Sequence, residues 1–248
     1  HFEGTPFDMQ QDIGAGPYKV PYRWRPMTFT VDSVEYVNER ATATQQTGFS
    51  FVAHMRSWLP DPVGGVFWFG VDDANTSVYV PMFCGITEIP TCFKVGNGDM
   101  LTFSWTSAFW IYNWVANQAY HKYSYMIKDI RPIQKALESG FEADLPKLDN
   151  LARSLYTQYP DSVRRLLTRY SVEQAEASTA RWKQLGEYLM VKYIDGNVKK
   201  EKDGHFERNA YGQPAYPDFP GYDPEYYRQV AKDAGDKLKV TKTIHDKQ

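Results

Sequence analysis

The clearest alternation of apolar and polar residues runs through the stretch Thr44–Phe83. Its first run carries apolar side chains at every second position and polar side chains between them. This pattern predicts a strand that is half buried against a core. The apolar face consists of Phe49, Phe51, Ala53 and Met55, and the polar face consists of Gln46, Ser50, His54 and Arg56.

Two further runs complete this stretch. Val66–Val71 is apolar throughout, which is typical of a central strand covered on both faces. Thr76–Phe83 is short and rich in β-branched and aromatic residues. Because turn-forming residues separate the runs, Thr44–Phe83 is predicted to form a three-stranded antiparallel meander. Met27–Val37 also alternates and is expected to add a strand, so residues 1–103 are predicted to be mainly antiparallel β-structure.

The spacing of apolar residues changes to three and four positions beyond residue 104. Thr106–Tyr125 is apolar on nearly all sides, which predicts a helix buried against the sheet. Tyr125–Gln158 is expected to form one or two helices, with interruptions near Ser139-Gly140 and at Pro146.

Two more helices are expected before residue 196. Asp161 is placed to cap a short helix that reaches Tyr170. The sequence Ser171-Val-Glu-Gln174 has the form of a capping box and predicts the start of a longer helix. Residues 104–196 are therefore predicted to be mainly helical.

Residues 197–248 are predicted to be an irregular tail with a possible final helix over 227–248. Within this tail, residues 211–226 contain four prolines, which argues against regular structure there. Neither an internal repeat nor a linker divides the chain, so residues 1–248 are interpreted as one unit. A sheet followed by helices predicts the α+β class.

Composition narrows the functional classes. The 248 residues are 42% hydrophobic and 23% charged, as expected of a globular protein. A formal net charge of −2 gives no electrostatic case for binding nucleic acid or an anionic membrane. No apolar run approaches the roughly 20 residues that a membrane-spanning helix needs. The compartment, whether periplasmic, secreted or cytoplasmic, stays open.

Familiar catalytic motifs are missing from the sequence. It contains no Gly-x-Ser-x-Gly, no phosphate-binding glycine loop and no His-Glu-x-x-His. The two cysteines, Cys84 and Cys92, are eight positions apart. They form either a disulfide or two buried thiols, and the thiols are the favoured interpretation. Two cysteines without further ligands at suitable spacing do not indicate a zinc site.

The polar face of the first strand is the best candidate site. A solvated sheet face and a binding site explain this pattern equally well. Arg56 lies beside aromatic residues and is suited to holding a carboxylate through a forked pair of hydrogen bonds. Asn75 could present an amide to a substrate, and Gln46 shares the polar face with Arg56. The neighbouring Asp72 and Asp73 are interpreted as turn residues.

Several of these runs resemble the C-terminal half of the C69 family of dipeptidases, of the dipeptidase A type. The resemblance covers His1 to about Lys199 and is most specific along the meander. The runs that carry it are HFEGTPFD, PYRWRP, TQQTGFSFVAHMRSWLPDPVGGVFWFGVDD, NTSVYVPMFCGITEIPTCF, FWIYNWVANQAYHKYSYM and SVEQAEASTARWKQLGEYL.

This resemblance implies an N-terminal nucleophile hydrolase with a four-layer αββα sandwich of two antiparallel sheets between helices. It implies a nucleophilic cysteine at the start of the mature chain, with its own α-amino group as the base. A free α-amine titrates near 8, close enough to neutrality to accept the thiol proton. The thiolate would attack a dipeptide carbonyl and form an acyl-enzyme that water hydrolyses. No metal or cofactor is implied.

The chain departs from the family pattern because it begins with His1, in a motif that the family carries far downstream of its nucleophile. Neither Cys84 nor Cys92 aligns with that nucleophile. The chain is therefore expected to be the C-terminal portion of a cysteine dipeptidase and to be inactive alone. Gln46, Arg56 and Asn75 are predicted to bind substrate.

The expected partners are a dipeptide substrate and the N-terminal portion of the same protein. The exposed strand edge alternatively predicts a homo-oligomer. Two other functions stay open: a module that binds peptide or glycan without chemistry, and an amidase of the same superfamily that acts on other amides.

Overall fold

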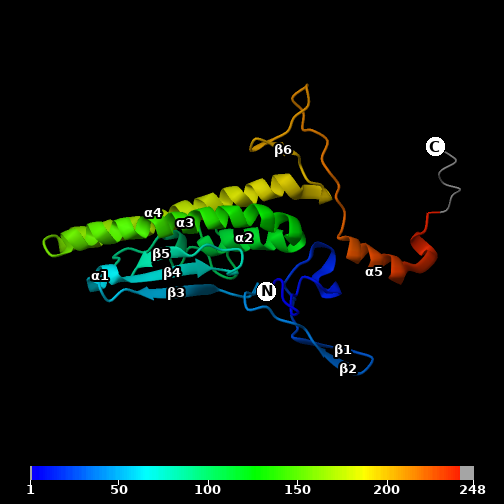
Figure 1. Cartoon of the computed structure of the whole chain (residues 1–248), viewed down its shortest axis with the longest axis horizontal. Helices are drawn as coiled ribbons and strands as arrows, with labels where there is room; N and C mark the ends of the chain where they lie inside the picture. The colour runs from blue at the N-terminus through cyan, green and yellow to red at the C-terminus, as the bar shows by residue number, and fades with distance from the viewer. Residues whose placement is uncertain (1, 241–248) are drawn as a thin grey trace.

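Among residues 2–240, which the computed structural model describes, a three-stranded antiparallel sheet lies beside a layer of long helices (Figure 1). Strands β3 (Phe49–Met55), β4 (Gly65–Val71) and β5 (Val80–Phe83) pair in that order. The helices are α2 (Ala108–His121), α3 (Tyr123–Tyr156) and α4 (Pro160–Tyr193). This arrangement confirms the α+β class and the central place of the apolar Val66–Val71 run.

Shorter elements connect or flank these two layers. No helix among the described residues is long and apolar enough to cross a membrane. The short elements are η1 (Ile13–Tyr18), β1 (Thr28–Val31), β2 (Val34–Val37), α1 (Asp61–Gly64), η2 (Thr91–Phe93), η3 (Ile194–Gly196), β6 (Glu201–Lys202), β7 (His205–Phe206), α5 (Pro224–Ala234) and η4 (Gly235–Leu238).

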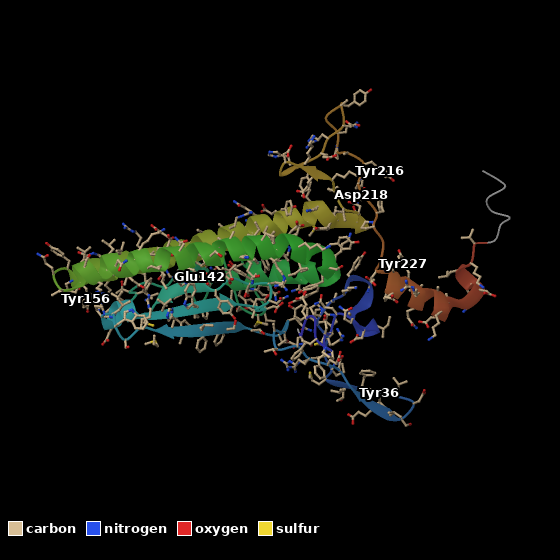
Figure 2. All side chains as sticks on the ribbon, viewed as in Figure 1. Tyr36, Glu142, Tyr156, Tyr216, Asp218 and Tyr227 are labelled. Carbon is tan, nitrogen blue, oxygen red and sulfur yellow. The ribbon has the colours of Figure 1, made fainter. Side chains whose placement is uncertain are left out.

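The prediction of a single strand over Met27–Val37 is wrong, because this segment folds back on itself as the hairpin β1–β2. Its turn residues, Asp32 and Ser33, have φ angles of 48° and 66°. Two consecutive positive φ angles match the twist of a tight hairpin, and aspartate tolerates them well. The hairpin, which carries Tyr36, stands away from the main body (Figures 1 and 2).

The third strand of the meander is shorter than predicted, since only Val80–Phe83 of the run Thr76–Phe83 pairs with β4. Helix α3 supplies other partners for the preceding backbone. The Tyr79 N–H donates to Glu138 Oε1 over 3.1 Å, and Gln134 Nε2 donates to the Ser77 carbonyl over 2.6 Å. Side chains of a distant helix therefore satisfy groups that would otherwise extend the sheet.

Helix α3 runs through Gly140 and Pro146 without the predicted interruptions. The buried side chains Phe141 and Leu145 lie between Gly140 and Pro146, next to each of them in sequence, and pack into the core. Tertiary packing of an apolar stripe outweighs the weak helix propensity of glycine and proline at these positions.

Helix α4 is also continuous, so the break predicted between Tyr170 and Ser171 is wrong. Ser171 does not cap a helix. Its hydroxyl donates to the Pro81 carbonyl and accepts from the Phe83 N–H, both over 3.1 Å. The side chain that suggested a helix start instead attaches α4 to strand β5.

Two of the three clusters of buried apolar side chains within residues 2–240 lie towards the two ends of the sheet. One cluster centres on α2 and α4, where the fully buried rings of Tyr112 and Trp182 stack with centroids 5.2 Å apart. The other cluster lies beneath the opposite end of β4 and β5 and includes Val66, Phe83 and Leu167. Burial of a large apolar side chain stabilises the fold by about 1.5–3 kcal/mol.

Lys122, at the break between α2 and α3, holds three distant segments together. Its ammonium lies 5.4–5.8 Å from the ring centroids of Tyr18, Tyr125 and Tyr193 and donates to the Asn197 carbonyl over 3.2 Å. The side chain is buried without a carboxylate partner among the described residues, and desolvation lowers its pKa. Cation–π contacts therefore take the place of an ion pair here.

Strand β3 is exposed on both faces, which contradicts the predicted half-buried strand. Phe49, Phe51 and Val52 are 60%, 52% and 57% exposed. The alternation of side chains is as predicted, but helices cover β5 and not β3 (Figure 1). Within residues 2–240 no strand pairs with the outer edge of β3.

The final helix begins earlier than predicted, at Pro224, where the Asp223 carboxylate accepts the Glu225 N–H over 3.0 Å. It ends at Ala234 and is followed by η4. The last part of the predicted helix, residues 241–248, lies outside the described residues.

We expect Gly186→Ala in helix α4 to lower the free energy of unfolding by about 1–3 kcal/mol, which urea denaturation would measure. A Cβ at this position would overlap the Trp114 ring. Gly140→Ala in α3 is the matched control, because no atom lies within 4 Å of its added Cβ. That change should stabilise by about 0.5–1 kcal/mol through helix propensity alone. Equal effects at both positions would contradict the close packing of α4 against Trp114.

Candidate functional site

The turn that follows β4 is a polar part of the protein interior. Asp72 and Asp73 are both fully buried. Asp72 has a φ of 65°, a conformation that few residues other than glycine adopt. Its N–H donates to the Gly48 carbonyl over 3.0 Å, which joins the turn to the residue before β3.

Asp73 is the centre of a hydrogen-bond network. Its Oδ2 accepts from the hydroxyls of Tyr22, of Thr76 over 3.3 Å and of Tyr120 over 3.4 Å. Its Oδ1 accepts the Asn75 N–H over 3.1 Å. Burial raises the pKa of Asp73, and the bonds from Tyr22 and Asn75 oppose that rise. The network connects the N-terminal loop, the turn and helix α2.

Asp72 has fewer partners. Its Oδ1 accepts from Asn113 Nδ2 of helix α2 over 2.8 Å, whereas its Oδ2 has no hydrogen-bond partner in the described part of the chain. Burial raises the pKa of this carboxyl to about 7, although the bond from Asn113 favours the charged form. Asp72 is therefore poised to change its charge near neutral pH.

Asn75 lies two residues beyond this pair and is half buried. Its Nδ2 donates to the Tyr123 hydroxyl over 2.8 Å, and its Oδ1 accepts from Arg131 over 3.4 Å. An amide nitrogen has two N–H donors, and the bond to Tyr123 fixes the plane of the amide. The predicted amide donor is thus held in a defined orientation.

The three residues predicted to bind substrate do not gather at one place. Gln46 precedes β3 and lies at the end of the sheet that carries Asn75, because Phe49 pairs with Val71. Arg56 follows β3 at the other end. Seven residues at about 3.3 Å each separate the two ends by roughly 23 Å. Only Gln46 and Asn75 can contribute to the same small site.

Arg56 is buried, and the protein itself occupies its guanidinium. Its Nε donates to the Gly64 carbonyl over 3.1 Å and its Nη2 donates to the Val63 carbonyl over 2.7 Å. Its Nη1 pairs with Asp149 of helix α3. The Arg56 guanidinium, which is expected to bind a substrate carboxylate, pairs with the Asp149 carboxylate instead. This ion pair attaches α3 to the turn between β3 and β4. Gln46, in contrast, is exposed, and its Oε1 accepts from Thr44 Oγ1 over 2.8 Å.

The two cysteines are unpaired, so the disulfide alternative is wrong. Cys92 is buried as expected of a core thiol, but Cys84 is exposed. Burial raises the pKa of Cys92 to about 12, which keeps it protonated at neutral pH. In the part of the chain that the structure describes, no group of three or more His, Cys, Asp or Glu side chains could hold a metal ion.

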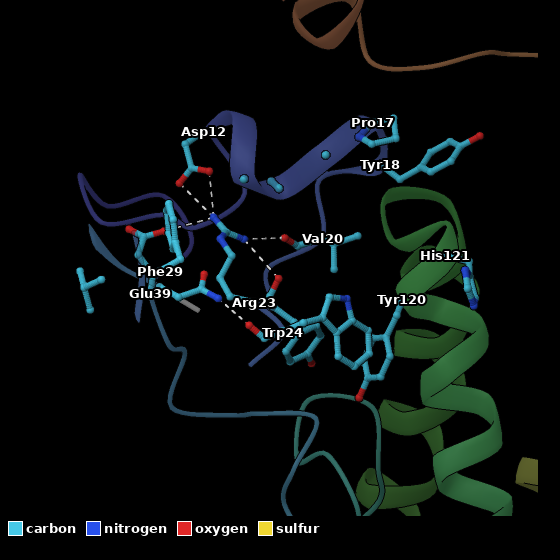
Figure 3. Close-up of a pocket in the computed structure, with 16 residues that line it drawn as sticks. Asp12, Pro17, Tyr18, Val20, Arg23, Trp24, Phe29, Glu39, Tyr120 and His121 are labelled. Atoms are coloured by element: carbon cyan, nitrogen blue, oxygen red, sulfur yellow. Dashed lines mark hydrogen bonds and ion pairs between the residues drawn. The ribbon is translucent and has the colours of Figure 1, made fainter. Parts of the chain in front are cut away.

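Two cavities flank the Asp72-Asp73 turn. The larger, about 730 Å³, lies between the N-terminal loop, the base of the β1–β2 hairpin and the end of α2, and Tyr22 and Tyr120 form part of its wall (Figure 3). Its half-buried Arg23 pairs with Asp12 over 2.9 Å and with Glu39 over 3.2 Å. The smaller, about 410 Å³, reaches Val71 at the end of β4.

The local pattern of the sequence predicts a turn at Asp72 and Asp73 but not their burial. It does not identify Tyr22, Tyr120 or Asn113 as their partners. One local signal existed: two adjacent carboxylates directly after an all-apolar strand are unlike an exposed turn. The tyrosine partners lie about 50 positions away in the sequence, and no local pattern identifies them.

A comparison with known protein families gives a match over the first half of the chain. Residues 1–136 match the model of Peptidase family C69. The match covers more than half of the chain, and the chain belongs to this family of peptidases. It includes the entire network around Asp72 and Asp73 and ends within helix α3. No curated protein matches the sequence.

We expect the stability of the wild-type protein to fall relative to Asp72→Asn as the pH rises from 4 to 8. Because the folded-state pKa lies above 3.8, the buried carboxyl stabilises the fold at low pH, and this contribution is lost as the pH rises through about 7. The rise in pKa corresponds to at most about 4 kcal/mol. Urea denaturation at intervals of one pH unit would measure the difference.

Asp32→Asn is the matched control for this experiment, since Asp32 also has a positive φ but is exposed on the β1–β2 hairpin. The control should follow the wild-type pH profile. If the free energy of unfolding of Asp72→Asn followed pH in parallel with that of the wild type, the Asp72 carboxyl would not titrate in this range.

Proposed function

We propose that the intact protein is a cysteine dipeptidase whose nucleophile lies on a segment upstream of the sequence described here. The observation that carries the proposal is the membership in a peptidase family together with a site that holds an oriented amide but no activated thiol. The reaction is hydrolysis of a dipeptide through an acyl-enzyme, with the α-amine of the first residue as base.

The surroundings of the two cysteines support an upstream nucleophile. A catalytic thiol needs a lowered pKa or an adjacent base. The pKa of Cys92 is raised, and among residues 2–240 no hydrogen bond joins Cys84 or Cys92 to a histidine. Cys84 lies at the end of β5, next to Gly65 and far along the sheet from Asn75. Neither thiol has the environment of a nucleophile.

The exposed face and unpaired edge of β3 suggest that a further strand pairs with this sheet. Phe51 and Phe67 stack across β3 and β4 with centroids 4.5 Å apart, yet Phe51 is 52% exposed. An unpaired edge with this much apolar surface is a template for another strand. We propose that the N-terminal portion of the same protein pairs there, and that a second copy of the chain is the alternative partner.

Asn75 is the residue of this chain that we assign to the chemistry. In acyl transfer, the carbonyl oxygen gains negative charge, and a fixed N–H donor stabilises it. Tyr123 accepts one N–H of the Asn75 amide, and the second N–H is available to a substrate oxygen. The bond from the Asn75 backbone to Asp73 holds the residue in place.

Gln46 and Arg56 receive different supporting roles. Gln46 lies at the Asn75 end of the sheet and is proposed to contact the substrate backbone. Arg56 is proposed to act at a distance, by holding the β3–β4 turn to α3 through Asp149. This assignment replaces direct substrate binding by Arg56, because its donors already have partners.

We expect replacement of the upstream cysteine by alanine to abolish dipeptide hydrolysis by the intact protein, since no other thiol is placed to attack. Cys84→Ala and Cys92→Ala are the matched controls and should retain activity. Release of amino acids from a panel of dipeptides measures the effect. Full activity in the upstream variant would contradict the mechanism, and loss of activity in Cys84→Ala would place the nucleophile in this chain.

We expect Asn75→Ala to lower kcat by about 10²–10³ with little change in KM, as for loss of one donor to a developing oxyanion. Asn117→Ala is the control, because Asn117 is exposed on α2 and, within residues 2–240, its side chain donates to Asn113 alone. Steady-state kinetics with one dipeptide would measure both. An effect on KM alone would assign Asn75 to ground-state binding. N-acyl substrates, tested in parallel, would distinguish a dipeptidase from an amidase that acts on other amides.

A further inference from the structure

The smaller of the two cavities is an apolar pocket at the Asn75 end of the sheet. It has a volume of about 410 Å³, within the range of ligand-binding pockets. Its floor includes the buried residues Val71 and Cys92, and its mouth includes the exposed Phe49. The pocket thus runs from the core of the protein to its surface.

Five of the fifteen residues that line this pocket are aromatic, namely Phe49, Phe69, Phe93, Phe109 and Trp110. Phe69 and Phe93 meet edge to face with centroids 5.2 Å apart, and Phe109 and Trp110 of α2 meet at 5.6 Å in the same orientation. Aromatic rings attract one another in edge-to-face and offset arrangements beyond the effect of buried area. An aromatic side chain bound here would gain such ring contacts, which an aliphatic or polar side chain would not.

The position of the pocket connects it to the proposed catalytic amide. Val71 forms part of the pocket and Asn75 follows four residues later. Four residues span at most about 14 Å, and the tight Asp72-Asp73 turn between them shortens this distance. A dipeptide spans about 7 Å of backbone, and its side chain adds several more. One substrate can reach both the Asn75 amide and the pocket.

The rim of the pocket carries one charge of each sign. Lys94 and Asp99 both lie there and are exposed. The Leu101 N–H donates to Asp99 over 2.8 Å and holds the pKa of that carboxyl below its usual range. No carboxylate in residues 2–240 pairs with Lys94. A free dipeptide has an ammonium and a carboxylate, which match these two charges.

We propose that this pocket binds an aromatic side chain of the dipeptide substrate and gives the enzyme a preference for dipeptides that contain Phe, Tyr or Trp. The inference rests on the proposed dipeptidase function and adds a substrate class to it. Cys92, whose thiol has no place in the proposed chemistry, forms the floor of the pocket and limits its depth.

The test compares kcat/KM of the intact enzyme for two series of dipeptides, X-Ala and Ala-X, in which X is Gly, Ala, Leu, Phe or Trp. In one series the wild-type enzyme should prefer Phe or Trp over Ala. Cys92→Leu fills the floor and should lower kcat/KM for the aromatic substrates roughly tenfold or more, with Ala-Ala changed far less. Cys84→Leu, the same substitution at a thiol outside the pocket, should leave the ratio unchanged.

A second variant covers the case in which Cys92→Leu does not fold, as judged by circular dichroism. Phe49→Ala removes a ring from the exposed mouth and should reduce the aromatic preference severalfold. Equal loss for Ala-Ala and aromatic substrates in these variants would overturn the pocket assignment. A flat wild-type profile would also overturn it and leave the dipeptidase proposal intact. If the wild-type enzyme cleaves no dipeptide, the proposed function fails and this inference fails with it.

Discussion

The burial of Asp72 and Asp73, neither of which forms an ion pair within residues 2–240, is the constraint on which the arrangement of the site depends. Two adjacent carboxyls in the interior are costly unless hydrogen bonds compensate for lost solvation. Here the donors come from the N-terminal loop through Tyr22 and from α2 through Asn113 and Tyr120. The turn can form only when these segments are in place, so the N-terminal loop, the sheet and the helices become interdependent.

At the opposite end of the sheet, an ion pair compensates a carboxylate for its lost solvation. Asp149 is partly buried there and is paired with the buried Arg56. A buried ion pair holds one geometry well, but it contributes less stability than its Coulomb energy suggests. Asp73, bound by hydroxyl and amide donors, lies next to the candidate site, whereas the ion pair lies roughly 23 Å away along the strand. Burial raises the pKa of carboxyls at both ends, of Asp72 and Asp73 near the candidate site and of Asp149 beside Arg56, where the guanidinium opposes the rise.

Local patterns in the sequence predicted the elements of the fold better than their ends. The alternation from Phe49 to Met55 and the apolar run Val66–Val71 each correspond to a strand, because the period of side chains is a local property. The breaks expected at Pro146 and Ser171 are absent, because distant contacts decide there: Leu145 packs in the core, and Ser171 bonds to β5. The site was only partly predictable for the same reason, since Asn75 has a local signal and its partner Tyr123 does not.

The exposed strand β3 and the rigid Asp72-Asp73 turn have complementary consequences for function. The turn fixes the Asn75 amide through Asp73 and Tyr123, so that its donor is oriented before a substrate arrives. The sheet next to it leaves Phe49 and Phe51 uncovered, and these rings border the side of the site that a second segment would close. A preorganised amide on one side and an open apolar face on the other are what a two-part active site requires. In the two-part site that we propose, the residues described here orient the substrate and the segment that covers β3 carries the attacking group.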